Sequence, residues 1–182
     1  MPLPKLSDAL IAWVIREVAA YIGKRRQAYR VHAVPLDGIQ RTAMQPFFPA
    51  LTLDSARIVV LSGKRVGNPL FYGELIRMGF EFRMLPDFAL MTAITFIDTV
   101  VSHKPLTDRV LFHELVHVVQ YEKLGLPEFS AKYVKGFLKG GRYEAIPLEM
   151  NAYQLDSRFA ASPAKAFSVA DQVQAWIDAG RF

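Results

Sequence analysis

The spacing of apolar and polar positions predicts helices at both ends of this 182-residue chain. Apolar side chains recur at helical spacing over residues 8 to about 27, and again in a short segment over about 170 to 179. Between residues 31 and 49, several prolines and an Asp-Gly pair interrupt the pattern. We therefore expect that stretch to connect other elements without regular structure of its own.

Two segments have the composition of β-strands. Residues 57 to 62 form a short apolar run closed by Gly63, and residues 88 to 101 are rich in Thr, Ile, Val and Phe. A turn near Asp98 is expected to divide the second segment. The apolar stretch from 70 to 85 fits either a helix or a strand. These patterns predict strands accompanied by helices.

The strongest helix pattern follows Thr107, which is expected to cap it, and should end at Gly125. Apolar residues surround this helix so completely that it must be buried. Along one edge, however, it carries the polar residues His113, Glu114 and His117. Polar groups on a helix enclosed by core are a local contradiction of the kind that marks functional sites.

The spacing of these three residues suits a metal site. Two histidines four residues apart on a helix lie about 6 Å along the axis and roughly 40° round it, so both can bind one zinc ion. Glu114 projects about 100° away from His113, close enough to act on a zinc-bound water without being a ligand. The pattern therefore predicts zinc ligands at His113 and His117 and a general base at Glu114.

A third ligand must come from a downstream carboxylate. The chain has no cysteine, and no histidine follows His117. Glu149 is the best candidate, because it stands in the first turn of a helix expected from Pro147 to about Phe159, whose other face is apolar. Glu144 and Asp156 remain alternatives.

Composition favours one folded domain over residues 1 to 182. The chain is 52% hydrophobic and 21% charged, with a formal net charge of +5. Nucleic acid is not an expected partner, because the basic clusters are not interleaved with aromatic residues in any recognised binding module. No signal peptide or membrane-spanning segment is evident, so we expect a cytoplasmic protein.

One basic cluster is expected to be the solvated end of the first helix: Lys24, Arg25, Arg26 and Arg30.

The residues around the motif resemble a known family. Leu111 to Tyr121, followed by Tyr143, by Pro147 to Glu149 and by Ala152-Tyr153, is similar to zincin-type metallopeptidases of the gluzincin kind. The likeness is greatest to small bacterial domains whose active helix contains His-Glu-Leu-Thr/Val-His-Val-x-Gln. It covers a core of roughly residues 54 to 160, including the Thr- and Ile-rich strand before the motif.

The resemblance implies an α+β, zincin-like fold, in which a small mixed twisted sheet packs on the active-site helix and a second, ligand-bearing helix. It also implies zinc ligation by His113, His117 and Glu149, with Glu114 as base. Gluzincins often place an acidic residue four positions after the third ligand to orient a histidine. Here that position is Tyr153, so the sequence does not identify the residues that orient the two histidines by hydrogen bonds.

The expected function is hydrolysis of peptide bonds in a peptide or protein substrate by a zinc-activated water. An oxyanion donor is also needed, and Tyr143 is the first candidate among those available: Tyr143, Tyr153, Arg142 and His103. The alternative is a zinc-binding interaction domain with little or no proteolytic turnover. The sequence leaves the oligomeric state and the substrate's identity open.

Overall fold

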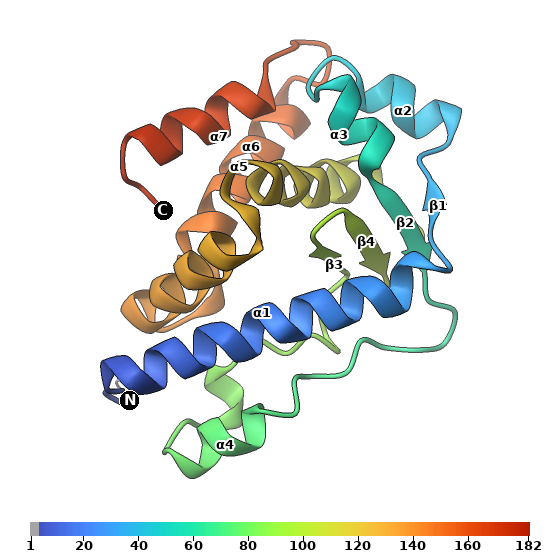
Figure 1. The fold of residues 1–182 in the computed structure, drawn as a ribbon. Coiled ribbons are helices and arrows are strands. Elements are labelled where there is room, and N and C mark those ends of the chain that lie inside the picture. Colours follow the sequence, from blue (N-terminus) through green and yellow to red (C-terminus); the bar gives the residue numbers. More distant parts are fainter. Residues whose placement is uncertain (1–3) are drawn as a thin grey trace.

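The computed structural model describes residues 4 to 182 as an α+β fold in which helices surround a small mixed sheet (Figure 1). The helices are α1 Asp8–Arg30, α2 Gly38–Met44, α3 Ala50–Ser55, α4 Tyr72–Arg77, α5 Asp108–Gly140, α6 Pro147–Ala161 and α7 Val169–Asp178. The strands are β1 Val34–Pro35, β2 Arg57–Val60, β3 Ala93–Phe96 and β4 Thr99–Ser102, and short 3-10 turns cover Phe82–Met84 and Tyr143–Ala145.

The four strands follow the order β1-β2-β4-β3, so β3 lies at one edge. Strands β2 and β4 are parallel, whereas β1 pairs with β2 and β3 with β4 in antiparallel fashion. Phe96 pairs with Thr99, which leaves Ile97 and Asp98 as a two-residue turn. The turn expected near Asp98 is therefore confirmed.

Ion pairs hold this turn against α1. Ile97 has a φ of 63°, an unfavourable value for a β-branched residue, so the turn needs support from outside. Arg26 donates two hydrogen bonds to the Asp98 carboxylate at 2.8 and 2.7 Å, and Arg30 lies 3.0 Å from it. The expectation that this basic cluster is a solvated helix end is therefore wrong for Arg26 and Arg30, because both pair with Asp98. The sequence did not indicate this pairing, since Asp98 is distant from both arginines along the chain.

The stretch from 31 to 49 is more ordered than expected. It contains β1 and α2, and the Asp-Gly pair begins the helix instead of a turn. Asp37 accepts a hydrogen bond from the backbone N–H of Gln40, whose side chain accepts one from the backbone N–H of Asp37. This reciprocal capping satisfies two donors that would otherwise be unpaired at a helix start.

Helix α5 begins where expected, with the Thr107 side chain capping the N–H of Val110. At Gly125 the backbone leaves the helical region, with φ 69° and ψ 164°, and the helix resumes in a new direction as far as Gly140 (Figure 1). Its first half is enclosed by two hydrophobic clusters that draw on almost every other element. The motif residues therefore sit on a rigid, buried segment.

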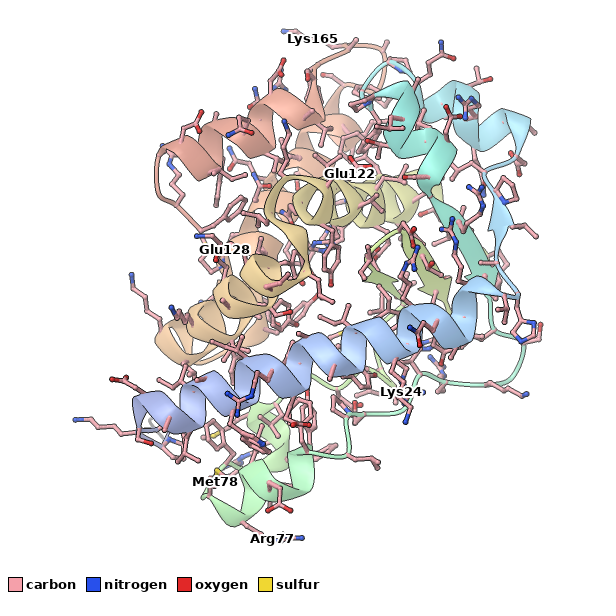
Figure 2. The ribbon with its side chains drawn as sticks, viewed as in Figure 1. Lys24, Arg77, Met78, Glu122, Glu128 and Lys165 are labelled. Carbon is pink, nitrogen blue, oxygen red and sulfur yellow. The ribbon has the colours of Figure 1, made fainter. Side chains whose placement is uncertain are left out.

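Charged side chains lie mainly on the outside of the molecule, as Lys24, Arg77, Glu128 and Lys165 illustrate (Figure 2). Within residues 4 to 182, no helix has the length and apolar character needed to cross a bilayer.

The ion pairs of Asp98 generate a prediction about stability. Burial raises the pKa of Asp98, but hydrogen bonds from Arg26 outweigh this effect and lower it. Asp98→Asn should therefore reduce the free energy of unfolding by about 1 to 2 kcal/mol at neutral pH, allowing for the partial exposure of the arginines. The loss should be complete above a pH of about 4 and fade as the pH falls through the lowered pKa of Asp98.

Urea unfolding of both proteins at neutral and acidic pH measures this difference. Asp54→Asn is the matched control, because Asp54 pairs with Arg41 on the surface and is 60% exposed. That substitution should change stability by less than about 1 kcal/mol. Equal losses for the two variants would show that the Asp98 pairs do not fasten the hairpin.

Candidate metal centre

Three buried side chains point their donor atoms at one another between α5 and α6. Nε2 of His113 and Nε2 of His117 are 3.2 Å apart. Oε2 of Glu149 lies 3.5 Å from the first of these nitrogens and 3.3 Å from the second. The expected residues are thus brought together, and the group could hold a metal ion.

Local sequence explains how α6 reaches the motif helix. Pro147 occupies the first turn of α6, where its missing N–H costs no hydrogen bond. Gly136 of α5 allows Pro147 to approach, since a Cβ at Gly136 would lie 2.6 Å from the proline Cδ. Glu149 then stands two residues after Pro147, in the first turn, facing α5. The helix N-terminus also favours its negative charge.

His113 is oriented by a carboxylate and an arginine. Its Nδ1 lies 2.8 Å from Oδ2 of Asp156, and the other oxygen of Asp156 accepts two hydrogen bonds from Arg109. An ionised carboxylate only accepts, so His113 must carry its proton on Nδ1. Its Nε2 faces Glu149 and offers a lone pair when the ring is neutral.

His117 is oriented by an amide. Its Nδ1 lies 2.9 Å from Oε1 of Gln120, whose Nε2 donates to the backbone oxygen of Leu148 and to Oδ1 of Asn151. The backbone oxygen can only accept, which fixes the orientation of the Gln120 amide. Gln120 therefore presents its oxygen to His117, and His117 also keeps its proton on Nδ1.

Both histidines consequently direct Nε2 at one carboxylate oxygen, where each Nε2 can carry a proton or bind a cation. Oε2 of Glu149 is buried and forms no hydrogen bond with any residue from 4 to 182. Leaving a buried carboxylate oxygen without a partner is costly, and with both rings neutral the three acceptors would repel one another. A cation among the three atoms would remove both penalties.

The pKa shifts agree with a site that attracts positive charge. Burial lowers the pKa of His113, but the hydrogen bond to Asp156 and the nearby carboxylates of Glu149 and Glu114 outweigh it and raise the pKa to about 10. Burial also lowers the pKa of His117, and the charge of Glu149 reverses this to a net increase. Burial raises the pKa of Glu149, but the two imidazoles bring it far below its usual range.

Glu114 is held beside these residues by the edge strand. The hydroxyl of Thr95 donates to Oε2 of Glu114 at 2.7 Å and lies 3.1 Å from its backbone oxygen. Glu114 is only 6% exposed and is not one of the three converging donors. It lines the same cavity as His117 and Glu149. Its carboxylate is therefore positioned next to the candidate centre without belonging to it.

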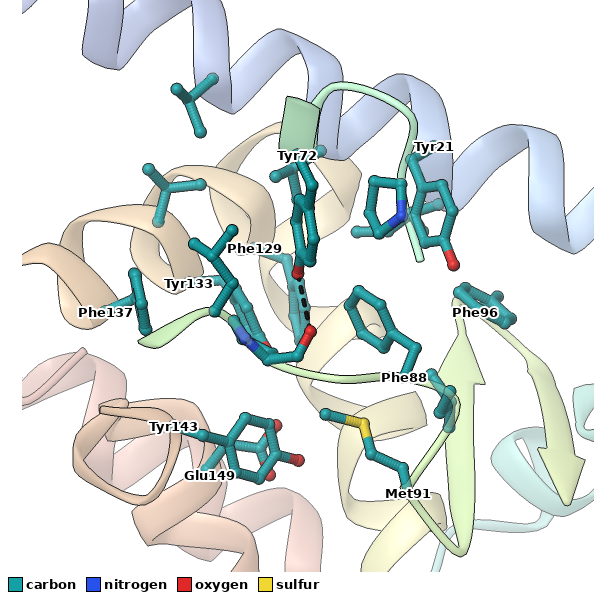
Figure 3. Close-up of a pocket in the computed structure, with 18 of the residues that line it drawn as sticks. Tyr21, Tyr72, Phe88, Met91, Phe96, Phe129, Tyr133, Phe137, Tyr143 and Glu149 are labelled. Atoms are coloured by element: carbon teal, nitrogen blue, oxygen red, sulfur yellow. Dashed lines mark hydrogen bonds between the residues drawn. The ribbon is translucent and has the colours of Figure 1, made fainter. Parts of the chain in front are cut away.

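A large apolar cavity opens on one side of the centre (Figure 3). Tyr143 lies beside Glu149 at the edge of this cavity, and burial raises its pKa well above the usual value. Tyr153 packs against the ring of His113, with centroids 4.7 Å apart, and is 41% exposed. Both tyrosines are therefore close to the candidate centre.

Other residues considered from the sequence lie elsewhere or play another part. Glu144 and Arg142 are exposed. Asp156 is not a third donor, because it contacts the opposite nitrogen of His113. His103, also considered as an oxyanion donor, accepts a hydrogen bond from the backbone of Val66 and contacts the Met91 carbonyl, so it supports two loops.

Sequence reasoning missed several orienting residues. Gln120 follows His117 by three positions on one helix, a spacing that does place two side chains in contact. Asp156 follows Glu149 by seven positions, two helical turns, which puts both on one face of α6. No local signal points to Thr95, because the pairing of β3 with the motif helix is a tertiary contact.

Comparisons with known proteins add no further assignment. The chain matches no protein-family model, no curated protein and no solved structure. The metal centre therefore rests on the geometry described above.

The geometry predicts that Glu149 is a ligand. Protein purified without a histidine tag should contain close to one metal ion per chain by elemental mass spectrometry. Glu149→Gln should lower metal affinity by more than roughly 100-fold, beyond the usual cost of losing an orienting partner. Glu144→Gln is the matched control, since Glu144 is an exposed carboxylate nearby. Full metal content in Glu149→Gln would refute this ligand assignment.

The orienting role of Asp156 gives a separate prediction. Asp156→Asn should weaken metal binding by roughly 10- to 100-fold, because an amide holds the His113 tautomer less firmly than a carboxylate. Competition with a chelator measures the affinity. Asp171→Asn, an exposed position on α7, should leave it unchanged. Equal affinities in the two variants would contradict the orienting role.

Proposed function

We propose that this chain is a zincin-type metallopeptidase that hydrolyses peptide bonds with zinc. The observation that carries the proposal is the convergence of His113, His117 and Glu149, with the separate carboxylate of Glu114 held alongside. A purely structural metal site needs a closed ligand set, whereas three protein ligands leave a coordination position open. The carboxylate of Glu114 can then serve as the general base that a metal-dependent hydrolase requires.

The donor set favours zinc. Ligands at the tetrahedral zinc distance of about 2.0 to 2.1 Å lie about 3.3 Å from one another. The three separations in the protein are 3.2, 3.3 and 3.5 Å. Calcium and magnesium prefer oxygen ligands, whereas two imidazoles and a carboxylate suit zinc and related transition metals. The residues present therefore fit zinc without rearrangement.

Zinc held there would polarise a substrate carbonyl and lower the pKa of a bound water toward neutrality. Glu114 takes a proton from the attacking water and later delivers it to the leaving amine. Thr95 fixes one oxygen of Glu114, so the other is left for this proton transfer. Tyr143 is the proposed donor to the developing oxyanion, because it lies beside Glu149 in the cavity.

The edge strand supports a peptide substrate. All four residues of β3, from Ala93 to Phe96, line the cavity, although alternate side chains point in opposite directions. The strand must therefore present its free edge to that space. An extended peptide can form backbone hydrogen bonds along this edge, which would carry its carbonyl groups past Glu114.

Glu114→Gln tests the mechanism directly. The variant should keep its zinc but lose about 10²- to 10⁴-fold in kcat, because the amide cannot accept the proton. Cleavage of a random peptide library, followed by mass spectrometry, measures the activity of the zinc-loaded proteins. Glu128→Gln, an exposed position on the same helix, should retain full activity.

The alternative interaction domain makes a different prediction for the same experiment. Zinc-loaded wild-type protein that leaves the whole library intact would contradict a peptidase and favour that alternative. Cleavage by Glu114→Gln at the wild-type rate would instead refute the role of the glutamate as base.

A further inference from the structure

The residues proposed for the chemistry are almost fully enclosed. Glu114 and His117 are each 6% exposed, and Glu149 is 4% exposed. The cavity beside them is walled by α1, β3, the second half of α5 and the segment that contains α4. For cleavage, a peptide backbone has to come within reach of these side chains. At least one wall must therefore move aside before a peptide can bind.

One wall, the segment of residues 68 to 90, is attached to the protein differently from the others. Among residues 4 to 182, no hydrogen bond or ion pair joins this segment to a residue outside it. Its polar groups bond to one another, as the Tyr72 hydroxyl does to the backbone oxygen of Pro86 (Figure 3). Helix α1, by contrast, is bound to the β3–β4 hairpin through Arg26. The segment is therefore the wall with the weakest polar attachment.

The two ends of the segment are joined to each other. The side chain of Asn68 donates a hydrogen bond to the Asp87 carboxylate at 2.9 Å and accepts one from the backbone N–H of Phe88 at 2.8 Å. These bonds close the segment at a narrow neck. Because they lie within the segment, its displacement as one body leaves them intact.

Apolar contacts hold the segment against the rest of the protein. Phe71 meets the ring of Trp13 edge-on with centroids 6.3 Å apart, and Phe88 stacks on Tyr21 at 5.5 Å. Leu75 is buried in the hydrophobic cluster that the segment shares with α1 and α5. Such contacts are non-directional, so they can separate and form again without leaving a buried N–H or C=O unpaired.

One side chain outside the segment contacts the residues that flank both of its ends. Nε2 of His103 accepts a hydrogen bond from the backbone N–H of Val66 at 3.0 Å, and its Nδ1 lies 2.6 Å from the backbone oxygen of Met91. That oxygen can only accept, so Nδ1 carries the ring proton and both ring nitrogens are engaged. Arg65, 3.2 Å from Nδ1, therefore cannot donate to it. His103 thus holds the two flanks of the segment together.

We propose that residues 68 to 90 form a lid over the metal centre, which opens at its flanks to admit a peptide, and that His103 is the catch that holds it closed. The choice of a peptide as the ligand admitted rests on the proposed function. The motion of the lid does not, because it follows from how the segment is attached.

Thiol labelling measures the motion without metal or peptide. The chain has no cysteine, so a single introduced thiol reports on its own position. Leu75→Cys places it on the buried face of the lid, and Val100→Cys places it in β4 as the matched control. Under native conditions the thiol of Leu75→Cys should react about 10-fold faster or more, because that of Val100→Cys needs wider unfolding. Equal rates would overturn the lid.

The same measurement tests the catch. Adding His103→Ala should raise the labelling rate of Leu75→Cys by about 5- to 100-fold, the factor expected for two lost hydrogen bonds, and that of Val100→Cys much less. His32→Ala, at an exposed histidine that follows α1, is the matched control and should change neither rate. An unchanged rate for Leu75→Cys, or an equal rise for both thiols, would overturn the role of His103.

A cross-link connects the lid to the proposed activity. Trp13→Cys combined with Phe71→Cys places one thiol on α1 and one on the lid, where the two rings now meet. Joining them with a short, reducible bismaleimide should lower peptide cleavage by the zinc-loaded protein about 10-fold or more, and reduction of the linker should restore it. The two single variants, treated in the same way, are the controls.

The outcomes separate this inference from the proposed function. Full cleavage by the cross-linked protein would overturn the lid as the route of entry and leave the peptidase standing. Fast labelling of Leu75→Cys without cleavage of any peptide by zinc-loaded wild type would support the lid and overturn the peptidase, and with it the peptide as the ligand admitted.

Discussion

Buried polar groups on one edge of α5 are the constraint on which the architecture depends. The helix lies between two hydrophobic clusters, so His113, Glu114, His117 and Gln120 cannot be solvated and must find partners within the protein. Helix α6 supplies most of them, and β3 supplies Thr95 for Glu114. The positions of α6 and β3 against α5 are therefore set by hydrogen bonds as well as by apolar packing. A shift of α6 by one turn would leave several buried groups unpaired, each at a cost of about 1 to 3 kcal/mol.

The candidate metal centre could be predicted where its signals were local. Histidines four positions apart on an apolar helix converge because helical geometry makes them neighbours. Pro147 marks the start of α6, and elimination of other ligand types leaves Glu149 as the strongest candidate. The two strand segments and the turn at Asp98 also follow from residue type and order. The histidine pair and the turn at Asp98 each depend on residues only a few positions apart. The position of Glu149 follows from the start of α6, which Pro147 marks clearly.

Where the deciding partner is remote, the sequence was a poorer guide. The pairing of Arg26 with Asp98 spans 72 residues. In the sequence alone, the arginines at the end of α1 have the pattern of ordinary surface charges. His103 was a candidate oxyanion donor, and its contacts with Val66 and Met91, which are remote in the sequence, show that it supports two loops instead. Helix α2 was missed for another reason: an Asp-Gly pair begins turns and helices alike, and only the reciprocal bond with Gln40 distinguishes them.

The burial of His113, His117 and Glu149 connects the stability of the fold to metal binding. Without a metal, the protein holds two imidazoles and a carboxylate within a few ångströms of one another in a buried site, where the raised pKa values of the histidines favour protons on their rings. Those protons balance the charge of Glu149, and the hydrophobic clusters on either side of α5 must still offset the cost of burying the three polar groups. A metal ion that bound only the folded chain would displace the protons from the two Nε2 atoms, and its binding free energy would add to that of folding. The packed first half of α5 holds the donor atoms close together, so a metal ion could bind there without rearrangement of the helix.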